Sequence, residues 1–129
     1  MIYYETEIKS AFTRIGKSRE RSRRMPINEI DELKNSFVEN LLPRRIYLFG
    51  SFAEGRQNSD SDFDFYIVVD DSQKDVLELT AKAYKSIRYK QKRAVDIIVN
   101  TEKTFESRKT KPLSVESEVA QKGVLLYER

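Results

Sequence analysis

Two aspartates at the start of an apolar segment have the spacing of a cation site. Asp62 and Asp64 alternate with Phe63 and Phe65 in a run that continues to Val69. In an extended strand, residues two apart leave the same face, about 6.6 Å apart along the chain. Like charges this close repel each other, and a cation between them relieves the repulsion. The pair therefore predicts a divalent-ion site that faces solvent, while Phe63 faces the interior.

A third carboxylate, Asp96, is the only charge in a second apolar segment, AVDIIV, residues 94 to 99. Neighbouring strands lie about 4.8 Å apart, so Asp96 can join the first pair if the two strands are adjacent. Three carboxylates can hold two Mg²⁺ ions, because magnesium prefers oxygen ligands. The structural alternative is that Asp96 forms a salt bridge with Lys92 or Arg93.

Gly50 and Ser51 end the apolar segment that starts at Ile46. A turn that opens a short helix at this point would present backbone N–H groups and a hydroxyl to an anion such as a phosphate. A metal pair beside a bound phosphate can align and stabilise an in-line displacement. The sequence therefore suggests phosphoryl or nucleotidyl transfer.

The composition narrows the chemistry further. The 129 residues include neither Cys nor His, which excludes disulfides, thiol nucleophiles, zinc–thiolate sites and imidazole catalysis. The formal net charge of +3 is weak, so it does not by itself indicate a nucleic-acid partner. No apolar run approaches the roughly 20 residues that cross a bilayer, and the N-terminus does not read as a signal peptide. We expect a cytoplasmic protein with no membrane partner.

The string GSFAEGRQNSDSDFDFYIVV, residues 50 to 69, resembles the signature of the DNA polymerase β-like nucleotidyltransferases, which is Gly-Ser, ten residues, then Asp-x-Asp. Asp96 falls where that family carries its third carboxylate, and residues 114 to 129 resemble the closing helix and strand of its minimal members. The resemblance spans about residues 27 to 129. It implies an α/β (α+β) nucleotidyltransferase fold, a mixed β-sheet backed by helices.

The resemblance also implies roles for the residues that match the signature. Asp62 and Asp64 would ligate Mg²⁺, and Asp96 would ligate metal and help to activate the attacking hydroxyl. Gly50 and Ser51 would bind the triphosphate of a nucleoside triphosphate, ATP being the expected one. The nucleoside monophosphate would pass to a hydroxyl and pyrophosphate would leave.

Minimal members of this family are commonly the antitoxin of a two-gene pair whose toxin is a helical HEPN ribonuclease, and some transfer AMP to a tyrosine of that toxin. We therefore expect AMP transfer from ATP to a HEPN-type protein partner, with nucleic acid not the direct substrate and self-association left open. One alternative is a catalytically weak subunit that only binds and neutralises its partner. The other is an antibiotic-type transferase, which usually needs a further helical domain.

Glu54 departs from the family pattern. Many relatives read Gly-Ser-x-Ala-Arg-Gly, whereas this chain has Glu54 at the arginine position and Arg56 two residues later. Three explanations stay open: Arg56 substitutes and contacts the nucleotide, Glu54 points away, or activity is impaired.

The hydrophobic periodicity predicts the elements that position these residues. Residues 1 to 26 form a helical and basic extension, whose charged run, 17 to 24, is taken as solvent-facing, and residues 27 to 129 form the domain. Within the domain we predict three strands, over 46–49, 62–69 and 94–99. We also predict a helix over 27–41 that Pro43 ends and a helix over 73–90. A polar link through Lys109 then leads to a helix that Gly123 ends and to an apolar terminus over 124–127. The helix over 73–90 is predicted to bury Val76, Leu77, Leu79, Ala83, Tyr84 and Ile87.

Overall fold

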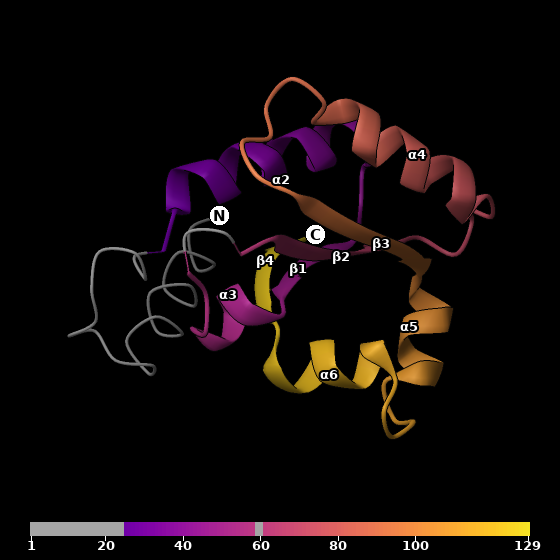
Figure 1. Cartoon of the computed structure of the whole chain (residues 1–129). Coiled ribbons are helices and arrows are strands. Elements are labelled where there is room, and N and C mark those ends of the chain that lie inside the picture. Colours follow the sequence, from indigo (N-terminus) through magenta and orange to yellow (C-terminus); the bar gives the residue numbers. More distant parts are fainter. Residues whose placement is uncertain (1–24, 59–60) are drawn as a thin grey trace.

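The computed structural model describes residues 25 to 58 and 61 to 129 (Figure 1). The predicted N-terminal helix and basic run lie outside the described residues. The elements in chain order are α2 (Ile27–Leu41), β1 (Arg45–Phe49), α3 (Ser51–Glu54), β2 (Phe63–Val69), α4 (Val76–Ser86), β3 (Val95–Thr101), α5 (Glu102–Arg108), α6 (Val115–Lys122) and β4 (Val124–Glu128).

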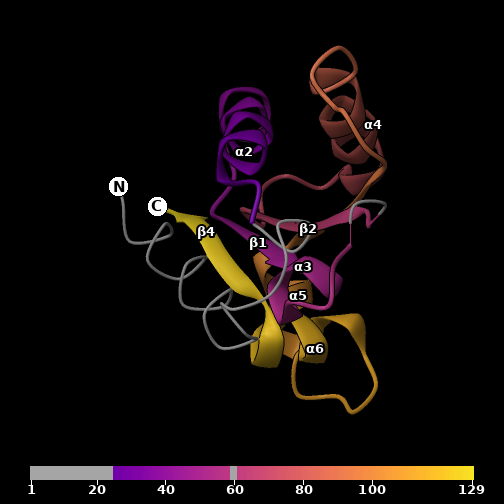
Figure 2. The ribbon, with the colours of Figure 1, turned by 60° about the vertical axis from the view of Figure 1, so that its left-hand side comes forward.

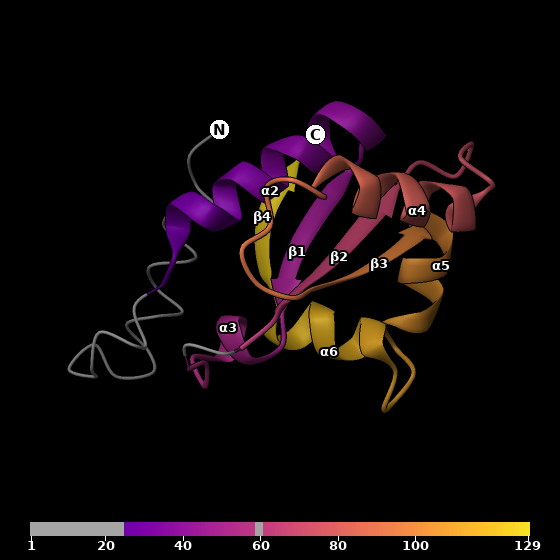
Figure 3. The same cartoon turned by 45° about the horizontal axis from the view of Figure 1, so that its top comes forward.

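The described part of the chain forms one mixed β-sheet of four strands in the order β3-β2-β1-β4, seen side by side in Figure 3. Strands β2 and β3 run parallel, whereas β1 is antiparallel to both β2 and β4. The connection between parallel strands needs a crossover, and α4 provides it. The predicted mixed sheet backed by helices is confirmed.

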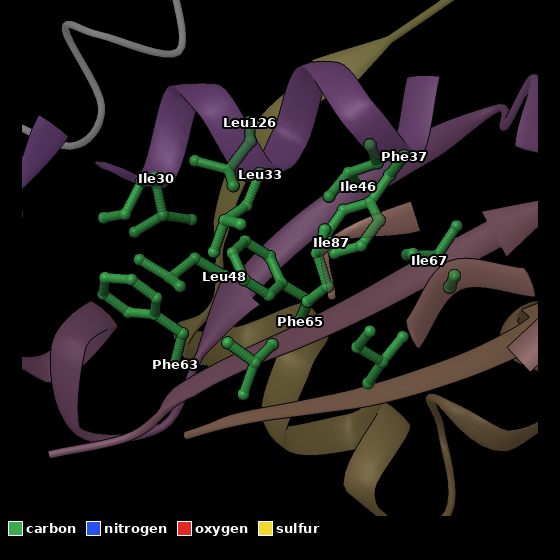
Figure 4. Close-up of a cluster of buried hydrophobic side chains, with 14 of the residues drawn as sticks. Ile30, Leu33, Phe37, Ile46, Leu48, Phe63, Phe65, Ile67, Ile87 and Leu126 are labelled. Atoms are coloured by element: carbon green, nitrogen blue, oxygen red, sulfur yellow. The ribbon is translucent and has the colours of Figure 1, made fainter. Parts of the chain in front are cut away.

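Helices cover both faces of the sheet. Helices α2 and α4 lie side by side over one face, and α5 and α6 lie under the other (Figures 1 and 2). The larger hydrophobic core fills the space between the sheet and the α2–α4 layer, where β2 contributes Phe63, Phe65 and Ile67 (Figure 4). A smaller cluster, containing Tyr66 and Phe105, lies between the sheet and α5 and α6.

Helix α2 agrees with its prediction at both ends. It buries Ile30, Leu33 and Phe37 at helical spacing, which packs one stripe of the helix on the sheet. It ends at Leu41 because Leu42 takes a left-handed conformation, with φ of 50°, and donates its N–H to the Val38 carbonyl. None of the helices in the described ranges has the length and apolar character that a membrane span requires.

Helix α4 is shorter than predicted, and part of its predicted core is exposed. It spans Val76–Ser86, and the side chain of Asp75 caps it by accepting from the Glu78 N–H at 3.0 Å. Leu77 is 79% exposed and Tyr84 39% exposed, although both were expected to be buried. Leu77 lies about 120° around the helix axis from the buried Ala83, so the two cannot share one narrow stripe. The face of α4 that packs on the sheet is therefore narrower than the number of apolar residues in this helix suggests.

Helix α5 was predicted as part of a polar link, and that prediction was wrong. Thr101 caps the helix by accepting from the Thr104 N–H at 3.3 Å. Phe105 is its single buried residue, and its ring lies 5.5 Å from that of Tyr47 and 5.3 Å from that of Tyr66. One apolar residue in seven gives no helical repeat, which is why the periodicity of the sequence does not reveal this helix.

Candidate functional site

Gly50 brings the end of β1 into contact with Asp64. The β1–β2 ladder pairs Phe49 with Asp64, so Gly50 is the next residue along from that pair. Its φ is 76°, and a Cβ added to it would lie 2.3 Å from Asp64 Oδ2. Both the left-handed backbone and the lack of space require glycine. The turn from β1 into α3 therefore lies against the Asp64 carboxylate.

Asp96 approaches Asp64 from the other side. The parallel register of β2 and β3 pairs these two residues directly. The pKa of Asp64 is raised to about 6, first by its partial burial and then by the negative charges of Asp96 and Asp62. A side-chain hydrogen bond between Asp64 and Asp96 raises this pKa further, because it favours the neutral form of Asp64. Asp64 thus lies near two other carboxylates, those of Asp96 and Asp62, and Asp96 is on the exposed side of its strand.

Asp62 lies one residue before β2, which begins at Phe63 rather than at residue 62 as predicted. Its side chain is exposed and acts on Asp64 through its charge. A fourth acid in this neighbourhood, Glu118 of α6, was not predicted from the sequence, and its charge also raises the pKa of Asp64. No local signal marks Glu118, because its position depends on how α6 packs under the sheet.

The chemistry of these carboxylates fits a divalent cation. Asp64 and Asp96 repel each other when both are ionised, and a bound cation would relieve that repulsion. All the atoms that could ligate a metal here are carboxylate oxygens, which are the ligands that Mg²⁺ prefers. Over residues 25–58 and 61–129, no three acidic side chains already converge as a formed metal cluster. The carboxylate pair with Asp62 beside it is therefore the set of residues that would hold the ion.

Ser51 begins α3 immediately after the Gly50 turn, as the predicted short helix requires. The helix spans Ser51–Glu54 and is anchored by buried Phe52 and Ala53. Gly55, with φ of 70°, ends it, and the Arg56 N–H bonds to the Ser51 carbonyl at 2.9 Å. Its length is four residues, so packing of the two apolar side chains rather than helical propensity holds it in place.

Two cationic side chains, those of Arg56 and Lys122, lie near the carboxylate of Glu54. Glu54 Oε2 lies 3.3 Å from Arg56 Nη2, and Glu54 Oε1 lies 3.9 Å from Lys122 Nζ at the end of α6. Arg56 was predicted to contact the nucleotide, and here its guanidinium pairs with Glu54. Lys122 was not singled out from the sequence, because it lies 68 positions from Glu54 in the chain.

Arg93 ties together the segments that carry the candidate site. Its guanidinium forms two hydrogen bonds to the Glu29 carboxylate, at 3.0 and 3.1 Å. It also lies 5.2 Å from the ring centre of Phe52 and 4.6 Å from that of Phe63. Glu29, and not Asp96, is thus the ion-pair partner of Arg93 within the described chain. The arginine positions α3, the start of β2 and the approach to β3 against α2.

The sequence matches the family model described as the nucleotidyltransferase domain over residues 30–125. This match covers most of the chain, and the mixed sheet with its paired carboxylates agrees with it. The chain therefore belongs to the nucleotidyltransferase domain family. No curated protein sequence matches the chain.

Solved structures similar to this chain include two toxin–antitoxin structures and a protein from Sulfolobus solfataricus. A toxin–antitoxin crystal structure with AMP-PNP shares 22% identity, covering 81% of this chain and 74% of that chain, with a TM-score of 0.46. A Sulfolobus solfataricus protein assigned as a nucleotidyltransferase shares 20% identity over 95% and 88% of the two chains, with a TM-score of 0.47. A mutant MntA-HpeT toxin–antitoxin structure shares 21% identity over 79% and 73%, with a TM-score of 0.44.

Proposed function

We propose that this protein is a Mg²⁺-dependent nucleotidyltransferase that transfers AMP from ATP to a hydroxyl group of a protein partner. The observation that carries the proposal is the contact between Asp64 and Asp96 across the parallel strands, directly beside the Gly50 turn. Membership of the nucleotidyltransferase domain family gives the reaction class. The use of ATP and the transfer to a protein hydroxyl are proposed in addition to that reaction class.

The proposed roles follow from the position of each side chain. Asp62, Asp64 and Asp96 would hold Mg²⁺, which when bound neutralises charge on the phosphates and aligns them. Asp96 is exposed beside Asp64, so an acceptor hydroxyl can reach it and lose its proton to it. That oxygen would bond to the α-phosphorus, and the bond from the α-phosphorus to the departing pyrophosphate would break. Ser51 would contact the phosphates from the start of α3.

The proposed acceptor is a tyrosine of a HEPN-type toxin, with this chain as the antitoxin. Support comes from the resemblance of residues 27 to 129 to the minimal members of the family. A second candidate function is a binding subunit that neutralises its partner without catalysis. The observation that favours it is Glu54, a carboxylate at the position where many relatives carry an arginine.

Incubation with labelled ATP and Mg²⁺, with and without the product of a neighbouring gene, tests the proposal. We expect label on the partner protein. The double variant Asp62→Asn with Asp64→Asn should lower transfer by about 100-fold or more, because the phosphates lose the charges that hold their cation. The matched control is Glu39→Gln, on an exposed position of α2, which should transfer at the normal rate.

The outcomes separate the candidate functions. Transfer that survives the double substitution would refute the assignment of the metal-binding carboxylates. Partner binding without any label, in the presence of Mg²⁺ and ATP, would support the non-catalytic subunit instead. Thermal unfolding of each variant checks that its fold is intact.

A further inference from the structure

The pairing of β1 with β4 brings the end of α6 beside the candidate phosphate-binding turn at Gly50. The β1–β4 ladder pairs Leu48 with Val124, and Val124 follows directly on Gly123 and Lys122, where α6 ends. Gly123 confirms the close approach, because a Cβ added to it would lie 3.4 Å from the Leu48 carbonyl oxygen. The end of α6 is therefore fixed next to the end of β1, independently of any side-chain contact.

The side chains in this corner form a small ionic cluster made of Glu54, Arg56 and Lys122. The Arg56 and Lys122 side chains are 63% and 59% exposed, whereas that of Glu54 is 22% exposed. Ion pairs between exposed side chains contribute little to stability. A stronger anion from solution can therefore displace Glu54 from the two cations at low cost.

We propose that Arg56 and Lys122 bind the β- and γ-phosphates of the nucleotide, and that Glu54 holds both cations until the triphosphate displaces it. This inference rests on the proposed nucleotidyltransferase function and deepens it. A nucleoside triphosphate carries several negative charges against the one of Glu54, so the exchange favours the nucleotide.

The competition gives Glu54 a distinctive signature. If Glu54 competes with the phosphates, then its neutralisation strengthens nucleotide binding. If Glu54 only orients the two cations, then its neutralisation weakens binding. The sign of the change therefore decides between competition and positioning.

Calorimetric titration with Mg²⁺–ATP and, separately, with AMP tests the inference. Glu54→Gln should bind ATP several-fold more tightly. Lys122→Ala and Arg56→Ala should each bind ATP about tenfold more weakly, because each loses one charge-assisted contact. Binding of AMP, which lacks the β- and γ-phosphates, should stay within twofold in all three variants. Lys82→Ala, on the exposed side of α4 across the sheet, is the matched control and should change neither titration.

The contrary results are equally specific. Weaker ATP binding by Glu54→Gln, or unchanged ATP binding by Lys122→Ala, would overturn the inference. If the wild-type protein still binds ATP in that case, the proposed function is not affected. Equal losses for ATP and AMP would also overturn it, because the contacts would not be with the outer phosphates. A folded wild-type protein that binds no Mg²⁺–ATP would refute the proposed function and, with it, this inference.

Discussion

The two faces of the sheet differ in chemistry, although the same strand supplies both. On the α2–α4 face, β2 places Phe63, Phe65 and Ile67 in a core built from apolar side chains. On the α5–α6 face, the alternate residues of β2 include Asp64 and Tyr66. One alternating segment therefore serves stability on one side and chemistry on the other.

The second face has a buried polar network in place of a large apolar core. The Tyr66 hydroxyl donates to Glu116 Oε2 at 2.6 Å, and Asn100 Nδ2 donates to the Tyr66 hydroxyl at 3.1 Å. Arg108 Nε donates to the other Glu116 oxygen at 2.9 Å. Because Tyr66 is two residues from Asp64 on β2, this network fixes α6 next to the candidate site. Directional hydrogen bonds thus hold α6 in a defined position beside the candidate site, which apolar packing alone would do less specifically.

The largest effect should come from the apolar face. Phe65→Ala removes a fully buried ring that lies 5.1 Å from the ring centre of Phe37, and should lower the free energy of unfolding by about 3–5 kcal/mol. Urea denaturation followed by circular dichroism measures this loss. A loss under about 1 kcal/mol would mean that the core of this face does not hold the sheet.

A smaller loss is expected in the polar network. Tyr66→Phe leaves a Glu116 oxygen without its donor, which should cost about 1.5–3 kcal/mol at neutral pH. Burial alone would raise the pKa of Glu116, but hydrogen bonds from Tyr66, from its own backbone N–H and from Arg108 hold that pKa below its usual 4.5.

The pH dependence tests the same bond. A carboxyl whose folded pKa is lowered contributes stability above its usual pKa and loses that contribution as the pH falls through its folded pKa. The difference in unfolding free energy between wild type and Tyr66→Phe should therefore be full at pH 7 and shrink below about pH 4.5. A difference that stays constant with pH would show that the charge of Glu116 is not involved.

Asp64→Asn should stabilise the protein in the absence of Mg²⁺. The folded pKa of Asp64, about 6, lies above its usual 3.8, so the ionised form opposes folding and stability falls as the pH rises through this range. The variant should melt a few degrees higher than wild type at pH 7.5 and at nearly the same temperature at pH 4. Added Mg²⁺ should raise the melting temperature of wild type more than that of the variant. An equal difference in melting temperature between variant and wild type at both pH values would contradict the repulsion between Asp64 and its neighbouring carboxylates.

The smallest effect is expected at Leu77, which the sequence pattern assigned to the core. Because its side chain is largely exposed, Leu77→Ser should change the free energy of unfolding by no more than about 0.5 kcal/mol. The same denaturation experiment measures it beside Phe65→Ala. A loss of 2 kcal/mol or more would place Leu77 in a contact that the fold described above does not contain.

Much of the fold could be predicted because it is encoded locally. The spacing of Ile30, Leu33 and Phe37 predicted α2, and Pro43 marked its end. The alternation from Phe63 to Val69 predicted β2 and assigned its faces. Helix α5 was not predicted, because its single buried residue, Phe105, gives no hydrophobic periodicity. Its burial is evident only from the aromatic rings that pack around it.

The amino-acid sequence is enough to identify the candidate reactive groups, namely the Gly-Ser turn at residue 50 and the carboxylates at 62, 64 and 96, because residue type and spacing are local properties. Which of these groups come together depends on tertiary contacts. The parallel register that pairs Asp64 with Asp96, and the packing of α6 that brings Glu118 and Lys122 to the same corner, depend on contacts between distant segments. Those contacts are selected by the packing free energy of the whole chain, which no local pattern contains.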